Sequence, residues 1–336
     1  MNPVKTEQQK ENNWKVQSTP QDHSFFPTVG VALWLGWNGG LLYLVIYLVC
    51  FASKFCRVFW LGIFVASMTL PNDFPKVYGK RLGGWIALQA EKYFALKTTL
   101  EDEQAICKYE VEGKAVIYAL EPHDILPYGI FALNAILKRF PASCKARYGL
   151  MTSAVFNLPI MKQMYTHMGA SPVDKKTFRK HLERGESVGL VPGGAHEVIM
   201  MNPDAPEELV LYLNSRKGFI KLALESGSPI VPMFAFNIDG SFGYWFPRGK
   251  FMEKIARFLG FLPVFFWGRW GIPFGIPRPQ KVHLVVGKPI HIPCEGHNVQ
   301  VESVNKYHRI FLNEMESLYE RHKVSEGYGN RTLKII

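Results

Sequence analysis

The sequence has few charged residues and few cysteines. Charged residues make up 20% of the 336 residues, whereas 48% are hydrophobic and 14% are aromatic. Such a chain buries enough apolar surface to offset its loss of conformational entropy, which argues against disorder over most of its length. Its five cysteines form no Cys-x-x-Cys pair; they are Cys50, Cys56, Cys107, Cys144 and Cys294. This pattern argues against a disulfide-based secreted fold and a cysteine zinc site, and favours a reducing compartment.

Motifs for metal-dependent and serine-dependent hydrolysis are absent or misplaced. His196-Glu197 is followed by no second histidine at the spacing of a zinc-binding helix, so we expect no metal. Residues 185–189 match G-x-S-x-G, but a helix-like stretch precedes Ser187 and a strand-like run follows it. A nucleophile elbow needs the opposite order, so the motif does not predict a catalytic serine.

The chain is basic, with a net charge of +11 from 39 Lys and Arg against 28 Asp and Glu. A basic protein attracts anionic partners such as nucleic acid, acidic lipid or phosphate-bearing ligands. No zinc finger, RNA-recognition motif or basic zipper is visible, so we expect lipid or a phosphate-bearing ligand and no nucleic acid. Residues 1–23 carry balanced charges and are predicted to be a polar N-terminal tail.

Two long uncharged runs follow this tail. No charged residue occurs from Ser24 to Ser53, and none from Val58 to Asn72, with Lys54 and Arg57 between the runs. A helix needs about 20 apolar residues to cross a membrane, so the stretch Val29–Ser53 is long enough. The second run is too short to cross alone. We therefore predict that residues 24–72 form a membrane-embedded hairpin, either transmembrane or re-entrant.

The remaining chain, residues 73–336, alternates short apolar runs with amphipathic stretches. Continuous apolar runs are typical of strands that are covered on both faces. The predicted strands are Val116–Leu120, Tyr148–Val155, Ser187–Val191, Ile230–Phe236 and Val282–Val286. The predicted helices are Ile130–Phe140, Ile160–Gly169, Lys175–Arg184, Ser215–Gly227 and Val301–Lys323. This alternation predicts an α/β domain with a mainly parallel sheet flanked by helices.

Chemistry in such a sheet is expected outside the carboxyl ends of the strands. Glu121, His123 and Asp124 follow one predicted strand, and histidine is suited to act as a general base because its pKa lies near neutral pH. Gly193 and Gly194 follow another strand, where their amides can approach a phosphate or a developing oxyanion.

Three cations lie at or near the start of a predicted helix. They are Arg216, Lys217 and Lys221, and they are suited to bind a phosphate-bearing ligand. A solvated basic surface is the alternative interpretation.

Five sequence blocks occur in a characteristic order. They are EPHD with ILPYG from Glu121, VPGGAHE from Val191, RKGFIKLALESGSPIVP from Arg216, FWGRWGIPFGIPRPQKVHLVVGKPI from Phe266, and ERHK from Glu320. From about Tyr93 to the C-terminus, the chain resembles the type-2 acyl-CoA:diacylglycerol acyltransferase family in its plant and algal branch. The apolar N-terminal hairpin before an α/β domain is also similar to the layout of that family.

The resemblance implies an O-acyltransferase that makes triacylglycerol from acyl-CoA and diacylglycerol, with acyl-CoA as a substrate and no cofactor. It also implies an endoplasmic reticulum membrane protein, multi-pass or hairpin-anchored, that reaches the lipid droplet surface and contacts membrane lipid. A homo-oligomer is compatible with this expectation.

The sequence departs from the family pattern at several positions. Glu121 stands where animal members have His, and Asp124 replaces the usual Ser or Gly. The family's Tyr-Phe-Pro block reads Tyr93-Phe94-Ala95, and Gly-Gly-Val-Gln-Glu reads Gly-Gly-Ala-His-Glu in residues 193–197. The wider glycerolipid acyltransferases use His-x4-Asp, whereas this chain has Tyr128 at that spacing. The differences at Asp124, at residues 93–95 and at residues 193–197 lie near the expected site or its approach. We expect them to affect the choice of acceptor alcohol more than the type of reaction.

The expected mechanism is a direct transfer with His123 as the general base. Glu197, or alternatively Glu121, would orient the imidazole as the carboxylate of a triad does. The amides of Gly193 and Gly194 would stabilise the oxyanion, with Asp124 near the substrate. Arg216, Lys217 and Lys221 would hold the CoA phosphates.

Three alternatives stay open at this point. The first is a sister O-acyltransferase acting on monoacylglycerol, a long-chain alcohol, or a sterol or isoprenoid alcohol. The second is a lipid hydrolase that uses Ser187. The third is a non-enzymatic lipid-droplet protein whose hairpin is its function.

Overall fold

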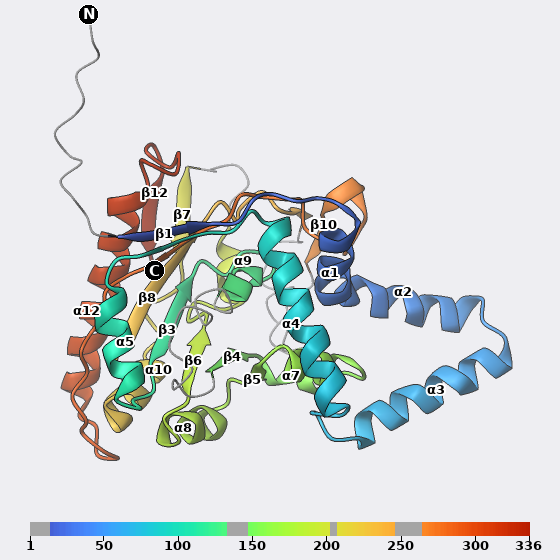
Figure 1. Cartoon of the computed structure of the whole chain (residues 1–336), viewed down its shortest axis with the longest axis horizontal. Coiled ribbons are helices and arrows are strands. Elements are labelled where there is room, and N and C mark those ends of the chain that lie inside the picture. Colours follow the sequence, from blue (N-terminus) through green and yellow to red (C-terminus); the bar gives the residue numbers. More distant parts are fainter. Residues whose placement is uncertain (1–13, 133–146, 202–206, 246–263) are drawn as a thin grey trace, which may run out of the picture.

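The computed structural model describes residues 14–132, 147–201, 207–245 and 264–336 (Figure 1). An eight-stranded sheet forms its centre in the order β1-β2-β11-β8-β3-β6-β4-β5. The β1–β2 and β11–β8 pairs are antiparallel and the other pairs are parallel. The strands are β1 Lys15–Ser18, β2 Lys97–Leu100, β3 Ile117–Glu121, β4 Arg147–Met151, β5 Ala170–Pro172, β6 Ser187–Leu190, β8 Ile230–Phe236 and β11 His283–Val286. The predicted α/β fold with a mainly parallel sheet is confirmed.

Helices cover both faces of this sheet, and the strand pleat decides which side chains meet which helices. On β3, Ile117 and Ala119 belong to one core cluster, whereas Tyr118 and Leu120 belong to the other. The first cluster includes residues of α8 Lys175–Glu183, α10 Gly218–Ser226 and α12 Val301–His322. The second includes residues of α1 Phe25–Leu35, α4 Lys76–Tyr93, α5 Glu103–Val111 and α7 Met161–His167. Figure 1 shows α12 and α4 on opposite sides of the sheet.

Most predicted elements agree with the structure, and the differences have local causes. Strand β4 ends at Met151, four residues before its predicted end, because the Thr152 side chain caps the short 3₁₀ turn Ser153–Asn157. Within the predicted polar tail, residues 1–23, Lys15–Ser18 forms the edge strand β1, which was not predicted. The prediction Ile130–Phe140 lies mostly outside the described residues.

The apolar stretch Val29–Ser53, which is long enough for one membrane-spanning helix, is divided between two helices. The chain bends by 69° between α1 and α2, which covers Trp37–Cys50. Helix α1 belongs to the protein core, where Val31 and Trp34 are buried. Among the described residues, no single helix has the length and apolarity of a membrane span, and only the bent α1–α2 pair meets both measures.

Helix α2 and helix α3, Lys54–Thr69, project from the body and form the α2–α3 hairpin (Figure 1). Its side chains are largely exposed and apolar, including Val49, Phe51, Phe55, Val58, Phe59 and Leu61. Both helices of the hairpin are tied to the body. The Tyr43 hydroxyl donates to the Pro273 carbonyl at 2.7 Å, and Lys162 Nζ donates to the carbonyls of Met68 and Leu70 at 2.8 and 3.0 Å. The hairpin is therefore held at a defined angle to the sheet.

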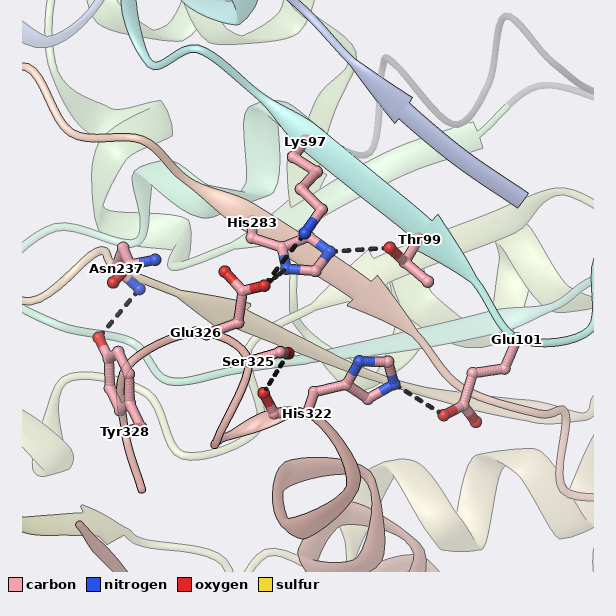
Figure 2. A network of polar contacts seen from close by, with 9 residues as sticks. All are labelled: Lys97, Thr99, Glu101, Asn237, His283, His322, Ser325, Glu326 and Tyr328. Carbon is pink, nitrogen blue, oxygen red and sulfur yellow. Dashed lines mark hydrogen bonds and ion pairs between the residues drawn. The ribbon is translucent and has the colours of Figure 1, made fainter. Parts of the chain in front are cut away.

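The closing ERHK block has a structural role at the end of α12. Arg321 donates twice to the buried Glu101 carboxylate, at 2.9 and 2.8 Å, and His322 contacts the same carboxylate at 3.0 Å. Figure 2 shows Glu101 and His322 beside a second group in which His283 contacts Thr99 and Glu326 at 2.8 Å each. These contacts join α12 to β2 and β11. Arg321 and His322 of the ERHK block therefore have a structural role, as partners of the buried Glu101 carboxylate.

Two small sheets complete the fold. Strand β7 Glu208–Leu211 pairs in parallel with β12 Thr332–Ile335, and β9 Gly243–Trp245 pairs in antiparallel with β10 Phe265–Trp267. Backbone hydrogen bonds from Leu213 and Asn214 to the carbonyl of Ile336 extend the first pair. That sheet fixes the segment just before α10, which contributes to the site described next.

Candidate active site

The candidate site lies where the parallel neighbours β3 and β6 end. Glu121 is the last residue of β3, and His123 and Asp124 follow it. The loop after β6 carries Gly193 and Gly194 and leads into the short helix α9, His196–Met200. Two segments distant in sequence therefore meet at the carboxyl edge of the sheet, as expected for a parallel sheet.

Hydrogen bonds through two carboxyl groups join these segments. Gly193 N–H donates to Glu121 Oε1 at 2.7 Å. Glu197 Oε2 accepts from His123 N–H at 2.7 Å, and its Oε1 accepts from Tyr212 N–H at 3.0 Å. Glu197 is buried and contacts the Glu121 side chain. The predicted contact between Glu197 and the imidazole is absent, because Glu197 binds the His123 backbone instead of its ring.

The imidazole of His123 is oriented by a carbonyl. Nδ1 lies 2.7 Å from the Asp124 carbonyl oxygen, and a carbonyl can only accept, so Nδ1 carries the hydrogen. Nε2 then has a free lone pair, and among the described residues no hydrogen-bond partner contacts it. Burial lowers the pKa of His123 to about 4, which keeps the ring neutral at pH 7. The tautomer leaves Nε2 available to accept a proton, while the lowered pKa makes the ring a weaker base than free histidine.

Asp124 supports this geometry through its backbone conformation. Its φ of 52° lies in the left-handed region, which Asp and Asn tolerate better than most residues and which Gly adopts freely. The Asp124 side chain is buried, and none of the described residues forms a hydrogen bond with its Oδ2. Burial, with smaller contributions from the charges of Asp239 and Glu197, raises the pKa of Asp124 to about 7. Its carboxyl group is a buried acid beside the candidate base.

The two carboxyl groups at the centre of the site are protonated more readily than isolated acids. Burial, and then the charge of Glu197, raises the pKa of Glu121 well above its usual range. Burial also raises the pKa of Glu197, although two backbone N–H donors and Arg216 favour its ionised form. Two carboxylates in contact repel each other, so the fully ionised pair is disfavoured.

The three predicted phosphate-binding cations lie in different environments. Arg216 donates to the Gly193 carbonyl at 3.2 Å, contacts His196 Nδ1 at 2.9 Å, and lies over the Tyr212 ring. Lys217 donates to Asn305 of α12 at 2.8 Å. Lys221 is exposed one helical turn further along α10. Of the three, Arg216 is the one that these contacts join to the Gly193 loop.

The two glycines also differ from each other. The Gly193 amide is occupied by Glu121, so it is not free to bind an oxyanion in this structure. Among the described residues, no acceptor contacts the amide of Gly194, whose φ is 63°. Of the predicted pair, Gly194 is therefore the available donor.

Sequence reasoning missed Tyr212 and His196 as parts of the site. Their rings are stacked with centroids 5.2 Å apart, and the guanidinium of Arg216 lies over the Tyr212 ring and contacts His196 Nδ1. Tyr212 acts on Glu197 through its backbone N–H, which carries no sequence signal. His196 belongs to the VPGGAHE block, but nothing in its spacing points to a contact with a residue twenty positions later.

The serine motif carries no catalytic geometry. Ser187 is fully buried, its hydroxyl donates to Glu110 at 2.8 Å, and it accepts from Val116 N–H at 2.9 Å. Helix α8 precedes it and β6 begins with it, as its sequence context predicts. Among the described residues, no group of three or more His, Cys, Asp and Glu side chains could hold a metal ion.

Comparison with known proteins identifies the family. The family described as "Diacylglycerol acyltransferase" matches residues 53–335. The chain belongs to the diacylglycerol acyltransferase family. The match covers both strand exits and the ERHK block, as the sequence resemblance predicts, and it begins about 40 residues earlier, so that it includes the hairpin helix α3.

Three relatives show how far the similarity extends. The chain is 34% identical over 238 residues to "Diacylglycerol O-acyltransferase 1" of Eremothecium gossypii, covering 67% of this chain and 50% of that protein. It is 28% identical over 316 residues to human "2-acylglycerol O-acyltransferase 3", covering 86% of each chain. It is 34% identical over 229 residues to "Diacylglycerol O-acyltransferase 2" of Dictyostelium discoideum, covering 63% of this chain and 67% of that protein. The chain therefore spans half of the first relative and most of the second.

Proposed function

We propose that the protein is an O-acyltransferase that moves a fatty acyl group from acyl-CoA to the free hydroxyl of diacylglycerol and so makes triacylglycerol. Family membership supports the reaction class. The observation that carries the residue assignment is the neutral His123 ring, with Nδ1–H bound to a carbonyl and Nε2 free. Such a ring can accept the proton of an alcohol.

The proposed transfer proceeds in one displacement at the thioester carbonyl. The acceptor hydroxyl oxygen attacks the carbonyl carbon while His123 Nε2 takes the hydroxyl proton. The tetrahedral intermediate then expels the CoA thiolate, which takes the proton from the imidazolium, so that ester and CoA thiol are formed. A positioned base typically contributes about 10²–10⁴-fold to such a step. The free Gly194 amide is our candidate donor to the oxyanion.

Phosphate binding is the proposed role of the cations near α10. Arg216 reaches the Gly193 loop, so a CoA phosphate or the thioester group beside that loop would lie within its range. Lys217 and Lys221 would contact the phosphates further out. A guanidinium and ammonium groups are suited to this because each donates several charge-assisted hydrogen bonds to phosphate.

Membrane attachment is proposed for the α2–α3 hairpin. Helices of 14 and 16 residues are about 21 and 24 Å long, which is most of a hydrocarbon core of about 30 Å. The exposed surface of both helices is apolar, and Lys54 and Arg57 at the turn can extend their charges to the far headgroups. Diacylglycerol and triacylglycerol would then diffuse laterally to and from the site. We propose the endoplasmic reticulum membrane and the lipid droplet surface as locations.

A second apolar surface supports the proposed insertion of the α2–α3 hairpin into the membrane. Trp245, Phe265, Trp267 and Trp270 of the β9–β10 region are exposed by 57, 54, 38 and 67%. This region is joined to the middle of helix α2 by the Tyr43–Pro273 hydrogen bond. Tryptophan is enriched at membrane–water interfaces, so these side chains fit the headgroup region beside the embedded helices.

The native cysteines test the topology. Cys50 and Cys56 flank the turn of the hairpin, whereas Cys294 lies on the body. In sealed microsomes, a membrane-impermeant maleimide applied outside should label a Cys294-only variant and leave Cys56-only protein unlabelled until detergent is added. Rapid labelling of Cys56 in sealed microsomes would contradict the embedded hairpin.

The acceptor alcohol can be identified by an acyl-transfer assay with labelled oleoyl-CoA, in membranes that lack other acyltransferases of this kind. Diacylglycerol, monoacylglycerol and a fatty alcohol are offered to wild type, His123→Ala and Ser187→Ala. We expect triacylglycerol from wild type and Ser187→Ala and none from His123→Ala at equal protein abundance. Monoacylglycerol is the second candidate acceptor, because the human relative that aligns over 86% of both chains is named for 2-acylglycerol. Absence of product from every acceptor would instead favour a non-enzymatic lipid-droplet role.

A further inference from the structure

We infer that Glu121 and Glu197 share one proton, carried by Oε2 of Glu121, and that this acid–carboxylate pair positions His123 and the Gly193 loop. Both glutamates are therefore positioning residues, which act through the backbone of the base and its neighbouring loop. The effects that this inference predicts on kcat rest on the proposed function. The effects that it predicts on folding stability do not.

The donors and acceptors around the pair locate the proton. Both oxygens of Glu197 accept backbone N–H groups, from Tyr212 and His123, so each of them needs a lone pair directed at a donor. Glu121 Oε1 likewise accepts from Gly193 N–H. Glu121 Oε2 is buried, and no donor from the part of the chain that the structure describes contacts it. It is the one oxygen of the four on which a hydrogen disrupts no contact, and the neighbouring Glu197 is the acceptor in reach.

The charges around the pair fit a single negative charge. Arg216 is the cation facing both carboxyl groups, from the segment before α10. His123, from the β3 exit, is neutral, and Asp124 and Asp239 add negative charge from the same edge of the sheet. A second full charge on the pair would have no counter-ion among these groups. Burial of an unpaired carboxylate is costly, which favours retention of the proton.

The pair connects three segments around the base. Through Glu197 it holds the His123 backbone and the Tyr212 backbone, and through Glu121 it holds the loop at Gly193. Because the imidazole is fixed to the carbonyl of the very next residue, a shift of this backbone moves Nε2 as well. Misplacement by about 1 Å can lower a catalytic rate on the order of 10²-fold.

Amide substitutions distinguish the two glutamates. In Glu121→Gln, the amide oxygen accepts from Gly193 and the NH₂ donates to Glu197, which reproduces the protonated acid. In Glu197→Gln, the NH₂ must face a backbone N–H of His123 or Tyr212, so one of these contacts is lost. We expect Glu121→Gln to lower kcat no more than about threefold, and Glu197→Gln to lower it on the order of 10²-fold with little change in the KM for acyl-CoA. Glu121→Leu makes neither contact, so its kcat should fall by about as much as that of Glu197→Gln.

A stability measurement tests the proton without any activity. A carboxyl group whose pKa is raised on folding destabilises the protein progressively as pH rises above its unfolded value of about 4.5. Glutamine does not titrate, so thermal unfolding of purified protein in detergent should show Glu121→Gln gaining stability relative to wild type between pH 5 and pH 9. Wild-type activity should also decline on the alkaline side, and Glu121→Gln should reduce that decline.

Three results would overturn the inference. They are a pH-independent stability difference between Glu121→Gln and wild type, Glu121→Gln no more active than Glu121→Leu, and Glu197→Gln as active as Glu121→Gln. If wild type transfers no acyl group to any acceptor, the proposed function fails, and the stability comparison still decides whether the proton is shared.

Discussion

The two adjacent glycines after β6 should respond differently to the same substitution. A Cβ at Gly193 would lie 2.0 Å from Glu197 Oε1 and 2.4 Å from its Cδ, so the carboxyl group has to move. Its bonds to His123 N–H and Tyr212 N–H would break or lengthen. Hydrogen bonds to a charged group contribute about 1.5–3 kcal/mol each, so Gly193→Ala should cost about 3–6 kcal/mol of folding stability. Relaxation of the loop would reduce this figure toward its lower bound.

Gly194→Ala is the matched control. No heavy atom lies within 4 Å of a Cβ at Gly194, but its φ of 63° is strained for alanine. The expected cost is about 1–2 kcal/mol, the usual penalty of a left-handed residue with a side chain. Unfolding in denaturant compares the stabilities of the two variants; activity is not compared, because Gly194 is also the candidate oxyanion donor. Equal losses of stability, or a larger loss for Gly194→Ala, would refute the view that Gly193 is required by its contact with Glu197.

Three further predictions concern the base, the buried acid beside it, and the ERHK contacts. His123→Gln should lower kcat by about 10²–10⁴-fold while leaving the unfolding temperature within a few degrees of wild type, and retained activity would exclude His123 as the base. Asp124 has a pKa raised to about 7, so wild type should lose stability as pH rises from about 4 to 7, and Asp124→Asn should flatten this dependence in thermal unfolding. Glu101→Gln should cost about 2–3 kcal/mol of folding stability, which is less than the loss of a fully buried ion pair because the Arg321 side chain is 37% exposed. Denaturant unfolding of the single and double variants should show that the effects of Glu101→Gln and Arg321→Ala are not additive.

Much of the sheet could be predicted because its strands are continuous apolar runs. Strand β8 matches its predicted bounds, Ile230–Phe236, and all seven residues are buried. Helix α12 ends within one residue of its prediction, since its apolar stripe repeats at helical spacing over six turns. Strand β1 was missed because a four-residue edge strand in a polar segment has no such pattern.

The membrane segment illustrates the limit of hydropathy. The run from Val29 to Ser53 is uncharged and mostly apolar throughout, so its composition does not reveal that Val31 and Trp34 pack into the core while Val49 is 68% exposed. The bend between α1 and α2 separates the two environments. Apolar sequence shows that a residue avoids water, but not whether protein or lipid replaces it.

The sequence by itself determined the fold class, the order of the five family blocks, and the two strand exits where chemistry was expected. These follow from local patterns: periodicity, glycine pairs and the position of His123 after an apolar run. Tertiary structure alone decided the roles of individual atoms. Glu197 binds the backbone of His123 instead of its ring, and Glu121 occupies the Gly193 amide. Hydrogen-bond partners are chosen by distances of about 3 Å between segments more than 70 residues apart, and the linear sequence carries no record of such distances.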